Sequence, residues 1–269
     1  MDSGDVEKCS PAGRRHWLAL AAAGLTGIWG VPRPGRAQDR APVRVAAASD
    51  LKFALADLAG LFQKETGHAV VLNLGSSGNF MRQIRQGLPV DLFLSADEGF
   101  VFQLADAGLT RDRGALYATG RLALVAPRGS TLPLDAELRG LRAHWGSISK
   151  FAIANPEHAP YGRAAQQALE KLGLWTLVQP KLVLGDNIAQ ATQFVATGAA
   201  QAGLTALSLA LAPELAALTR HVALPQALHA PLRQRMVLLK SASPAAQAFY
   251  DYLQGPAARE VLQRYGFSI

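Results

Sequence analysis

Cysteine is almost absent from this chain of 269 residues, and its only example is Cys9, near the N-terminus. One cysteine excludes an internal disulfide framework and a metal site built from thiolates. The six histidines do not replace it, because none has the His-x-x-x-His or His-Glu-x-x-His spacing of a zinc site. Hydrophobic runs are also short. None reaches the roughly 18 to 20 apolar residues that a membrane-spanning helix needs.

Charged residues are sparse, at 17%, while hydrophobic residues make up 49% of the chain. This balance excludes a disordered chain and a coiled coil. The length corresponds to one large or two modest domains, at roughly 100–200 residues each. The basic side chains are scattered, without a run or interleaved aromatic residues. We therefore expect no binding to nucleic acid.

The N-terminal segment is typical of a secretory signal peptide. Arg14-Arg15 precede an apolar stretch over 17–31, and Gly35-Arg36-Ala37 has the small-x-Ala form of a cleavage site. We expect cleavage after Ala37 and export to the periplasm by the Sec or the twin-arginine route, with a disordered leader or a buried helix as the alternative. Removal of residues 1–37 leaves 22 basic and 17 acidic residues, a net charge of +5. That charge suits an anionic small ligand or an acidic surface.

The rest of the chain alternates short apolar runs with segments of helical spacing. This β-α-β-α-β order favours a sheet of parallel strands covered by helices on both faces. Two such units are expected, with a boundary near Thr119-Gly120, and joined by strands because no flexible linker is present. The expected strands are 43–48, 69–74, 91–95, 122–127, 151–154, 181–184, 202–205 and 235–239. The expected helices are one from Leu51 to the stop at Gly67, one around 80–84, and those over 161–172, 188–196, 244–253 and 256–265.

Three turns of the same form carry the candidate chemistry, at Ser49-Asp50, Ser76-Ser77-Gly78 and Asp186-Asn187-Ile188. In each, a strand ends, small polar residues follow, and a helix begins. A helix start has free N–H groups and a partial positive charge. Because such starts lie together at the carboxyl ends of parallel strands, they can form an anion site without lysine or arginine.

Each of these turns, taken alone, is equally well explained as ordinary helix capping by Ser, Asp or Asn. We expect the carboxylates of Asp50 and Asp186 to turn back on the N–H groups of their own helices. Their backbone N–H groups would then remain free to face a ligand.

In its order of motifs, the chain resembles the molybdate-binding proteins of ABC importers. The segments that carry the resemblance are Ala46-Ala47-Ala48-Ser49, Ser76-Ser77-Gly78, 87–97 (GLPVDLFLSAD), 155–162 (NPEHAPYG), 248–253 (AFYDYL) and 264–267 (RYGF). Each motif is modest, but their ordered combination is specific, and it spans essentially all of the chain after the signal peptide.

The resemblance implies an α/β fold of the type II periplasmic binding protein class. Two lobes, each a mixed, mostly parallel sheet flanked by helices, would enclose a ligand cleft. We expect a signal peptide over 1–37, lobe I over 38–119, lobe II over 120–230, and a return to lobe I with the C-terminal helices over 231–269. The implied function is high-affinity capture of molybdate, and of tungstate, by a monomer. It would have no cofactor or catalytic activity, and it would deliver the oxyanion to an inner-membrane ABC permease with its cytoplasmic ATPase.

The resemblance also implies ligand residues. Ser49 and Ser77 match the two serine positions of the first lobe, which donate through hydroxyl and backbone N–H groups, and Ile188 matches a backbone N–H donor at a helix start. Asp50 matches a position that donates in some members, where asparagine or a similar residue is common. The aspartate departs from that pattern and puts its side-chain contact in question.

A second departure concerns a tyrosine ligand. Some members of the family use a tyrosine from a Gly-x-x-Tyr segment, and that position is Ala206 here. Another branch has its tyrosine where Tyr161 lies in this chain. We therefore predict that Tyr161 supplies the phenol O–H, with a packing role after Pro160 as the alternative.

Two other functions remain open from the residues. One is a binding protein for sulfate or phosphate. The other, more remote, is a periplasmic enzyme on the same fold. No Gly-x-Ser-x-Gly elbow is present, and His158, beside Tyr161, is the only conceivable general base. We interpret His158 as a structural hydrogen-bonding residue and His68, His221 and His229 as surface residues. A ligand-sensing module of a regulator is disfavoured by the signal peptide and by the lack of a DNA-binding extension.

Overall fold

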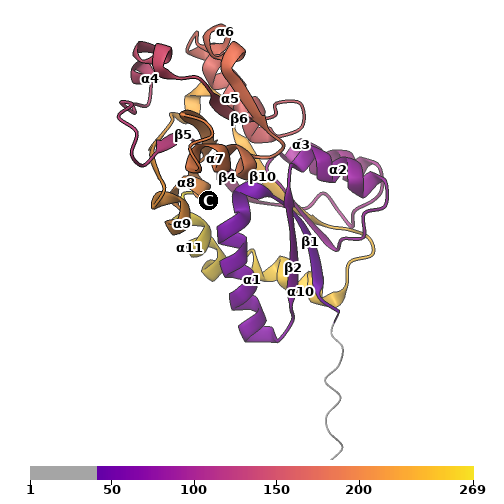
Figure 1. Ribbon diagram of the computed structural model, residues 1–269. Helices are drawn as coiled ribbons and strands as arrows, with labels where there is room; N and C mark the ends of the chain where they lie inside the picture. The colour runs from indigo at the N-terminus through magenta and orange to yellow at the C-terminus, as the bar shows by residue number, and fades with distance from the viewer. Residues whose placement is uncertain (1–40) are drawn as a thin grey trace, which may run out of the picture. The chain divides into compact units, whose positions relative to one another are not determined.

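A five-stranded sheet forms the framework of the first lobe in this computed structural model, which describes residues 41–269 (Figure 1). The predicted signal peptide and Cys9 lie outside the described residues. The strand order is β2-β1-β3-β10-β4, and only β10 runs against the other four. The strands are β1 (Val43–Ala48), β2 (Val70–Gly75), β3 (Leu92–Ser95), β4 (Ala115–Gly120) and β10 (Leu232–Leu238).

A second five-stranded sheet has the same plan, in the order β7-β6-β8-β5-β9, with only β5 reversed. Its strands are β5 (Leu122–Pro127), β6 (Phe151–Ala154), β7 (Leu182–Gly185), β8 (Ala202–Ala206) and β9 (Thr219–Ala223). Both sheets are mixed but mostly parallel, and the predicted fold class is confirmed.

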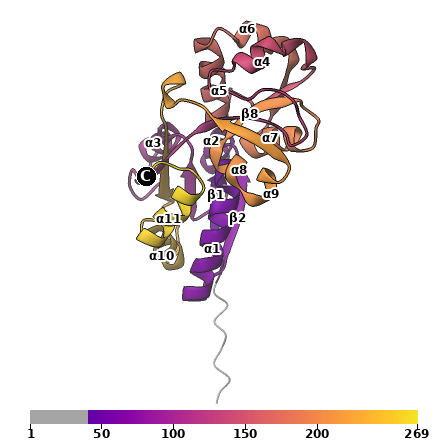
Figure 2. The same cartoon turned by 90° about the vertical axis from the view of Figure 1, so that its left-hand side faces the viewer.

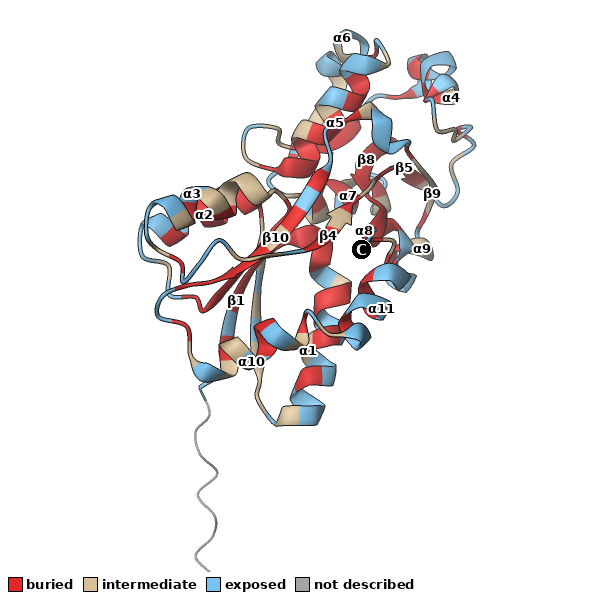
Figure 3. Ribbon diagram, turned by 180° about the vertical axis from the view of Figure 1, so that it is seen from behind, coloured by how far each residue is buried: buried red, intermediate tan, exposed pale blue. Residues whose placement is uncertain are grey.

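Helices cover both faces of the first sheet, because alternate residues of its strands point to opposite sides. Val43 and Val45 of β1 pack into one apolar cluster with α1, α10 and α11, whereas Ala46 packs into another with α2 and α3 (Figure 3). The elements are the 3-10 turn η1 (Ser49–Leu51) and the helices α1 (Lys52–Thr66), α2 (Ser77–Arg85), α3 (Glu98–Asp106), α10 (Pro244–Tyr252) and α11 (Pro256–Arg264).

Helices also cover both faces of the second sheet (Figure 2). Leu122 and Leu124 of β5 share an apolar cluster with α5, while Val125 packs against Val195 of α7 on the opposite face. The helices are α4 (Arg139–Ala143), α5 (Pro160–Lys171), α6 (Trp175–Val178), α7 (Ile188–Ala196), α8 (Leu207–Leu211) and α9 (Pro213–Ala216). The 3-10 turns are η2 (Trp145–Ser147), η3 (Gln179–Lys181) and η4 (Gln226–Leu228).

The chain crosses between the sheets twice by short connections. Only Arg121 separates β4 from β5, and residues 224–231 join β9 to β10. The first connection runs directly from strand to strand, whereas the second contains the 3-10 turn η4. None of the helices within residues 41–269 is long and apolar enough to cross a membrane.

Some elements were not predicted, namely α3, β4, β9 and the short helices α6, α8 and α9 of the second lobe, whereas α4 lies in the span 128–150 where one weak helix was expected. The expected strand at 235–239 also begins earlier, at Leu232. Arg233 is exposed in that segment, and Gln234 is buried although it is polar. Strand β9, with the sequence Thr-Arg-His-Val-Ala, pairs only with β5 at the edge of its sheet. Such polar sequences lack the apolar runs on which strand prediction depends.

Candidate functional site

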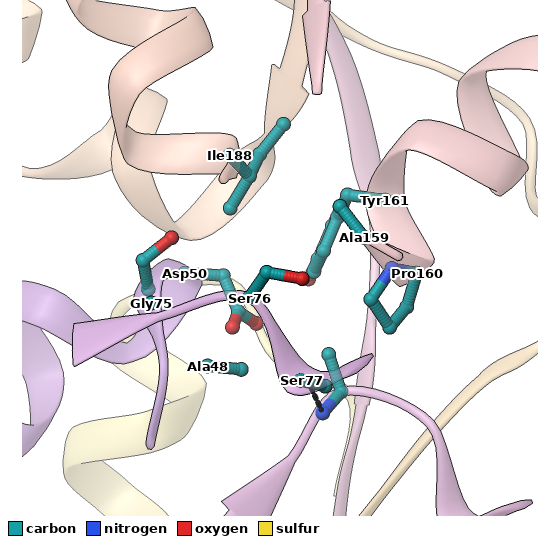
Figure 4. Close-up of a pocket in the computed structure, with 11 residues that line it drawn as sticks. Ala48, Asp50, Gly75, Ser76, Ser77, Ala159, Pro160, Tyr161 and Ile188 are labelled. Atoms are coloured by element: carbon teal, nitrogen blue, oxygen red, sulfur yellow. Dashed lines mark hydrogen bonds between the residues drawn. The ribbon is translucent and has the colours of Figure 1, made fainter. Parts of the chain in front are cut away.

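A small cavity lies between the two sheets (Figure 4). All five predicted site residues, Ser49, Asp50, Ser77, Tyr161 and Ile188, line it. The other lining residues are Ala48, Gly75, Ser76, Ala96, Ala159 and Pro160. The structure thus brings together positions that are up to 139 residues apart in the chain; their roles as ligand donors stay predictions.

The carboxyl ends of the parallel strands place these residues at the cavity. Ala48 ends β1, Gly75 ends β2, and Ala96 directly follows β3. From the second sheet, Ile188 begins the helix after β7, and Tyr161 is the second residue of α5. This is the position at which ligands bind in open α/β sheets, since the helix starts there point their N–H groups at the same space.

The cavity wall offers hydrogen-bond donors and carries no lysine, arginine or histidine among its lining residues. The N–H groups of Ser77 and Ile188 are at the first positions of their helices, where no acceptor exists inside the helix. The structure gives neither N–H another acceptor within residues 41–269. The same region contains no cluster of three or more His, Cys, Asp or Glu side chains that could hold a metal ion.

Ser77 is completely buried, and its hydroxyl has one proton to donate. The N–H of Ala96 donates to Ser77 Oγ at 3.0 Å, the bond drawn as a dashed line in Figure 4. That contact uses a lone pair of the oxygen and fixes the side chain. Because a hydroxyl is donor and acceptor at once, the O–H of Ser77 is still available to an oxygen in the cavity.

Ser49 instead connects the two lobes. Its hydroxyl donates to Asn187 Oδ1 at 3.0 Å and accepts from the N–H of Ala189 at 3.1 Å. Asn187 is the N-cap of α7, and its Oδ1 also accepts from Gln190 N–H at 3.1 Å. The first turn of η1 and the first turn of α7 are therefore held against each other at the cavity.

Tyr161 belongs to a buried polar network centred on Gln234. The Gln234 Nε2 group donates to Asp50 Oδ2 at 2.6 Å and to the Tyr161 hydroxyl at 3.2 Å. Tyr117 donates to Gln234 Oε1 at 2.7 Å. Gly120 leaves space for this network, because a Cβ atom there would overlap the Tyr161 hydroxyl and Gln234 Nε2.

Asp50 is the one carboxyl group in the wall, and it is 1% exposed. Burial raises the pKa of Asp50 from 3.8 to about 6, because desolvation disfavours the charged form. The hydrogen bond from Gln234 opposes this rise, as do the Tyr161 hydroxyl and the N–H groups of Asp50 and Leu51. Asp50 Oδ1 has no hydrogen-bond partner within the described residues.

The expectation that Asp50 and Asp186 cap their own helices is wrong. The N-cap of η1 is Ala48, without a side-chain hydrogen bond, and the Asp50 carboxyl is directed at Gln234. At the other turn Asn187 is the cap, while Asp186 accepts from Asn79 Nδ2 at 3.2 Å. At both turns a side chain distant in sequence donates to the carboxylate.

Around the cavity, contacts between the lobes form what we call the rim. Its members are His158, Arg163 and Asp186 on one side, and Ser76, Gly78, Asn79 and Asp97 on the other. The His158 carbonyl accepts from Ser76 Oγ at 2.6 Å and from Gly78 N–H at 3.0 Å, and His158 Nδ1 lies 2.9 Å from Ser76 Oγ. The Arg163 guanidinium pairs with Asp97 at 2.5 Å. His158 is thus a structural hydrogen-bonding residue, as interpreted from the sequence.

The interpretation of His229 as a surface residue is wrong. It is 9% exposed, and its Nδ1 lies 2.8 Å from the Ala230 carbonyl. Burial lowers its pKa, while the contact with that carbonyl opposes the shift. His68 and His221 are partly exposed.

Sequence reasoning missed Ser76, Asn187 and above all Gln234. Ser76 and Asn187 lie in two of the candidate turns, directly before Ser77 and Ile188, so the position before each helix start is the signal for them. Gln234 had no such signal, because it follows an arginine in a segment without an apolar run. Its burial between Asp50, Tyr117 and Tyr161 depends on strand β10 returning to the first sheet.

Known proteins resemble this chain in sequence and in architecture. The family described as bacterial extracellular solute-binding protein matches residues 43–268. The molybdate-binding protein ModA of Azotobacter vinelandii is 39% identical over 236 residues, which cover 87% of this chain and 92% of that protein. ModA of Escherichia coli (strain K12) is 33% identical over 264 residues, covering 95% of this chain and 99% of that protein.

A solved structure supports the same relationship. The periplasmic molybdate-binding protein of Azotobacter vinelandii superimposes with a TM-score of 0.78 at 32% sequence identity, over 84% of this chain and 99% of that one. The chain belongs to the family of bacterial extracellular solute-binding proteins that includes the ModA molybdate-binding proteins.

Proposed function

We propose that this protein captures the molybdate oxyanion outside the cytoplasm and delivers it to an ABC permease. The observation that carries the proposal is the cavity wall, where helix-start N–H groups and the Ser77 hydroxyl converge without a cationic side chain. The names of the matched relatives, which are molybdate-binding proteins, support molybdate as the ligand. No catalytic step is part of the proposal.

The ligand donors are Ser49, Ser77, Tyr161 and Ile188, with Asp50 beside them. Hydrogen bonds to a charged acceptor contribute about 1.5–3 kcal/mol each. Several such bonds from a preformed site offset the loss of hydration of a dianion. Tungstate has the same charge and shape as molybdate and is proposed as a second ligand.

Ligand binding acts on an equilibrium between open and closed lobes. The hydroxyl of Ser49 already bonds across the lobes, to Asn187 and Ala189. An oxyanion bound to donors of both lobes stabilises the closed form through its better fit to that form. The closed form then docks on the permease, whose cytoplasmic ATPase drives transport. We propose that the exported protein acts as a monomer.

Size is the basis proposed for selectivity over sulfate. Sulfate has the same charge and tetrahedral shape but shorter bonds, so it cannot reach all donors at once. Each donor left unpaired in a buried cavity costs about 1–3 kcal/mol. A loss at two or three donors is therefore enough for strong discrimination.

Isothermal titration with molybdate, alone and in molar excess of sulfate, tests the proposal. We expect one-to-one binding of molybdate that sulfate does not displace, and a similar result with tungstate. Binding of sulfate or phosphate in place of molybdate would overturn the choice of ligand and assign the cavity to another tetrahedral oxyanion.

A further inference from the structure

Asp50 places an acid where a dianion is expected to bind. Its carboxyl belongs to the wall of the cavity, and Figure 4 draws it among the other lining residues. One oxygen, Oδ2, accepts from Gln234 Nε2 at 2.6 Å, while Oδ1 has no partner within the described residues. An ionised carboxylate in this position could only accept hydrogen bonds, and so could every oxygen of a molybdate dianion.

No cation compensates the charge of Asp50. The elements packed against η1 include α7, α8 and β2, whose sequences contain no titratable side chain. The titratable groups that face Asp50 are the hydroxyls of Tyr117 on β4 and Tyr161 on α5, and the pKa of each is raised by burial and by Asp50 itself.

Three of the nearby arginines form ion pairs with other carboxylates. Lys52 of α1 is exposed, with its ammonium 5.1 Å from the centre of the Phe53 ring. Arg233 and Arg235 of β10 both pair with Glu98, and Arg163 of α5 pairs with Asp97. Arg121 Nε is buried without a hydrogen-bond partner within the described residues, and Arg121 is not among the groups that act on the Asp50 carboxyl. The remaining charged residues of α1 lie farther along the helix and are exposed.

We propose that Asp50 takes up one proton from solvent when a fully deprotonated oxyanion enters the cavity, and that it then donates this proton through Oδ1 to an oxyanion oxygen. The proposal rests on the proposed function. The proton balance is simple: solvent supplies one proton, the carboxylate becomes a carboxylic acid, and no covalent bond to the oxyanion forms. Repulsion between two neighbouring anions becomes a hydrogen bond, and Gln234 Nε2 still donates to Oδ2.

The energetics of the free site favour this step. Burial already raises the pKa of Asp50 to about 6 before any anion is present. A dianion alongside raises it further, because a like charge disfavours the ionised form. For uptake of a full proton at pH 8, the dianion must raise the pKa of Asp50 by more than burial alone does. A ligand that carries its own proton, such as hydrogen phosphate, would not need it, because it could donate to an ionised Asp50.

Titration calorimetry with sodium molybdate at pH 6.5 to 8.5, where molybdate stays a dianion, tests the proposal. Each pH is measured in two buffers of different ionisation enthalpy, so that the proton uptake is obtained from the difference in heat. For the wild type we expect about one proton taken up per molybdate at pH 8, and an association constant that falls about tenfold per pH unit above pH 7.

Two variants complete the test. Asp50→Asn keeps the shape of the side chain and supplies a neutral donor. It should bind without proton uptake or pH dependence, and about 100-fold more tightly than the wild type at pH 8. Asp106→Asn is the control. It removes the same charge at the end of α3, from an exposed ion pair with Arg113, and should retain the wild-type pH dependence.

Wild-type molybdate binding without proton uptake would overturn the proposal, whether or not the Asp50→Asn variant folds. Retention of the pH dependence in Asp50→Asn would overturn it as well. Absence of molybdate heat at every pH would instead reject the proposed function, and the inference with it. The two failures are therefore distinguishable.

Discussion

The interior of the cavity and its rim use different kinds of groups. Inside, the wall consists of helix starts, hydroxyls and one buried carboxyl, and no lining residue is basic. At the rim, charged side chains take part in contacts across the lobes, with Arg163 paired to Asp97 and with Asn79 Nδ2 donating to Asp186 at 3.2 Å. The interior is arranged for an anion to enter, whereas the rim is already satisfied by its own contacts.

This difference separates two tasks in the proposed function. Buried dipoles act in a low effective dielectric and discriminate ligands by the loss of whole hydrogen bonds. Exposed ion pairs typically contribute up to about 1 kcal/mol and are screened by salt. Ligand recognition is therefore expected to depend on the interior, and the rim to adjust the balance between open and closed lobes.

We expect the largest loss of molybdate affinity when an added methyl group fills the interior. In Gly120→Ala, the new methyl group overlaps the Tyr161 hydroxyl and Gln234 Nε2. Overpacking of this kind costs about 1–3 kcal/mol of stability, and displacement of the network should weaken molybdate binding by about 100-fold. The matched control is Gly129→Ala, where a Cβ meets nothing within 4 Å. Calorimetry and thermal unfolding measure both effects, and equal affinity in the two variants would contradict this description of the interior.

Asp50→Asn tests the buried carboxyl of the interior through protein stability, without any ligand. The pKa of Asp50 in the folded state, about 6, is above its ordinary value of 3.8, so the folded state holds this proton more tightly than the unfolded state does. Below about pH 4 the carboxyl is protonated in both states. As pH rises through about 6, the wild type loses up to about 3 kcal/mol of stability that the amide does not lose.

Urea unfolding of both proteins between pH 4 and 8 measures this loss. The stability difference between variant and wild type should grow between pH 4 and 6 and then stay constant. A difference that does not change with pH would show that the carboxyl titrates normally.

Ile188→Pro removes one donor from the interior while keeping the helix. Proline suits the first position of a helix, and the preceding Asn187 has the extended backbone (φ −148°, ψ 173°) that proline allows before it. Loss of one charge-assisted hydrogen bond should weaken molybdate binding about 10- to 100-fold. Ile188→Val tests the apolar contacts of the side chain alone and should bind nearly as the wild type. Similar affinities in both variants would show that the Ile188 N–H does not donate to the ligand.

Arg163→Gln, at the rim, is expected to have the smallest effect. The Arg163–Asp97 pair is about one-third exposed on both sides, and the guanidinium also lies over the Phe100 ring at 5.2 Å. We expect less than about fivefold weaker binding, and less still at high salt, because screening removes most of such a pair. A loss as large as that of Ile188→Pro would show that recognition is not confined to the interior.

The sequence predicts those parts of the site that depend on local rules. The turns at Ser77 and Ile188 were found because strand, polar turn and helix follow each other directly, and parallel strands bring such turns to one edge. The same local rules were wrong about Asp50 and Asp186. An aspartate at a helix start commonly caps that helix. Here the side chains of Gln234 and Asn79, which are distant in sequence, donate to Asp50 and Asp186 instead.

Elements with weak local patterns also escaped prediction. Strand β4 is necessary for the site, since it carries Tyr117 and Gly120, yet its sequence Ala-Leu-Tyr-Ala-Thr-Gly has no strong alternation. The polar Gln234 is buried only because β10 pairs between β3 and β4. Its burial depends on contacts more than 70 residues away in the chain, and no window of sequence contains that information.

A crystal of the protein grown with tungstate, with anomalous diffraction recorded near a tungsten absorption edge, locates the bound oxyanion directly. The account predicts a single strong anomalous peak inside the cavity, with oxyanion oxygens within hydrogen-bond distance of Ser77 Oγ, the Tyr161 hydroxyl and the N–H of Ile188. A peak outside the cavity, next to exposed lysine or arginine side chains, would contradict a site built from uncharged donors.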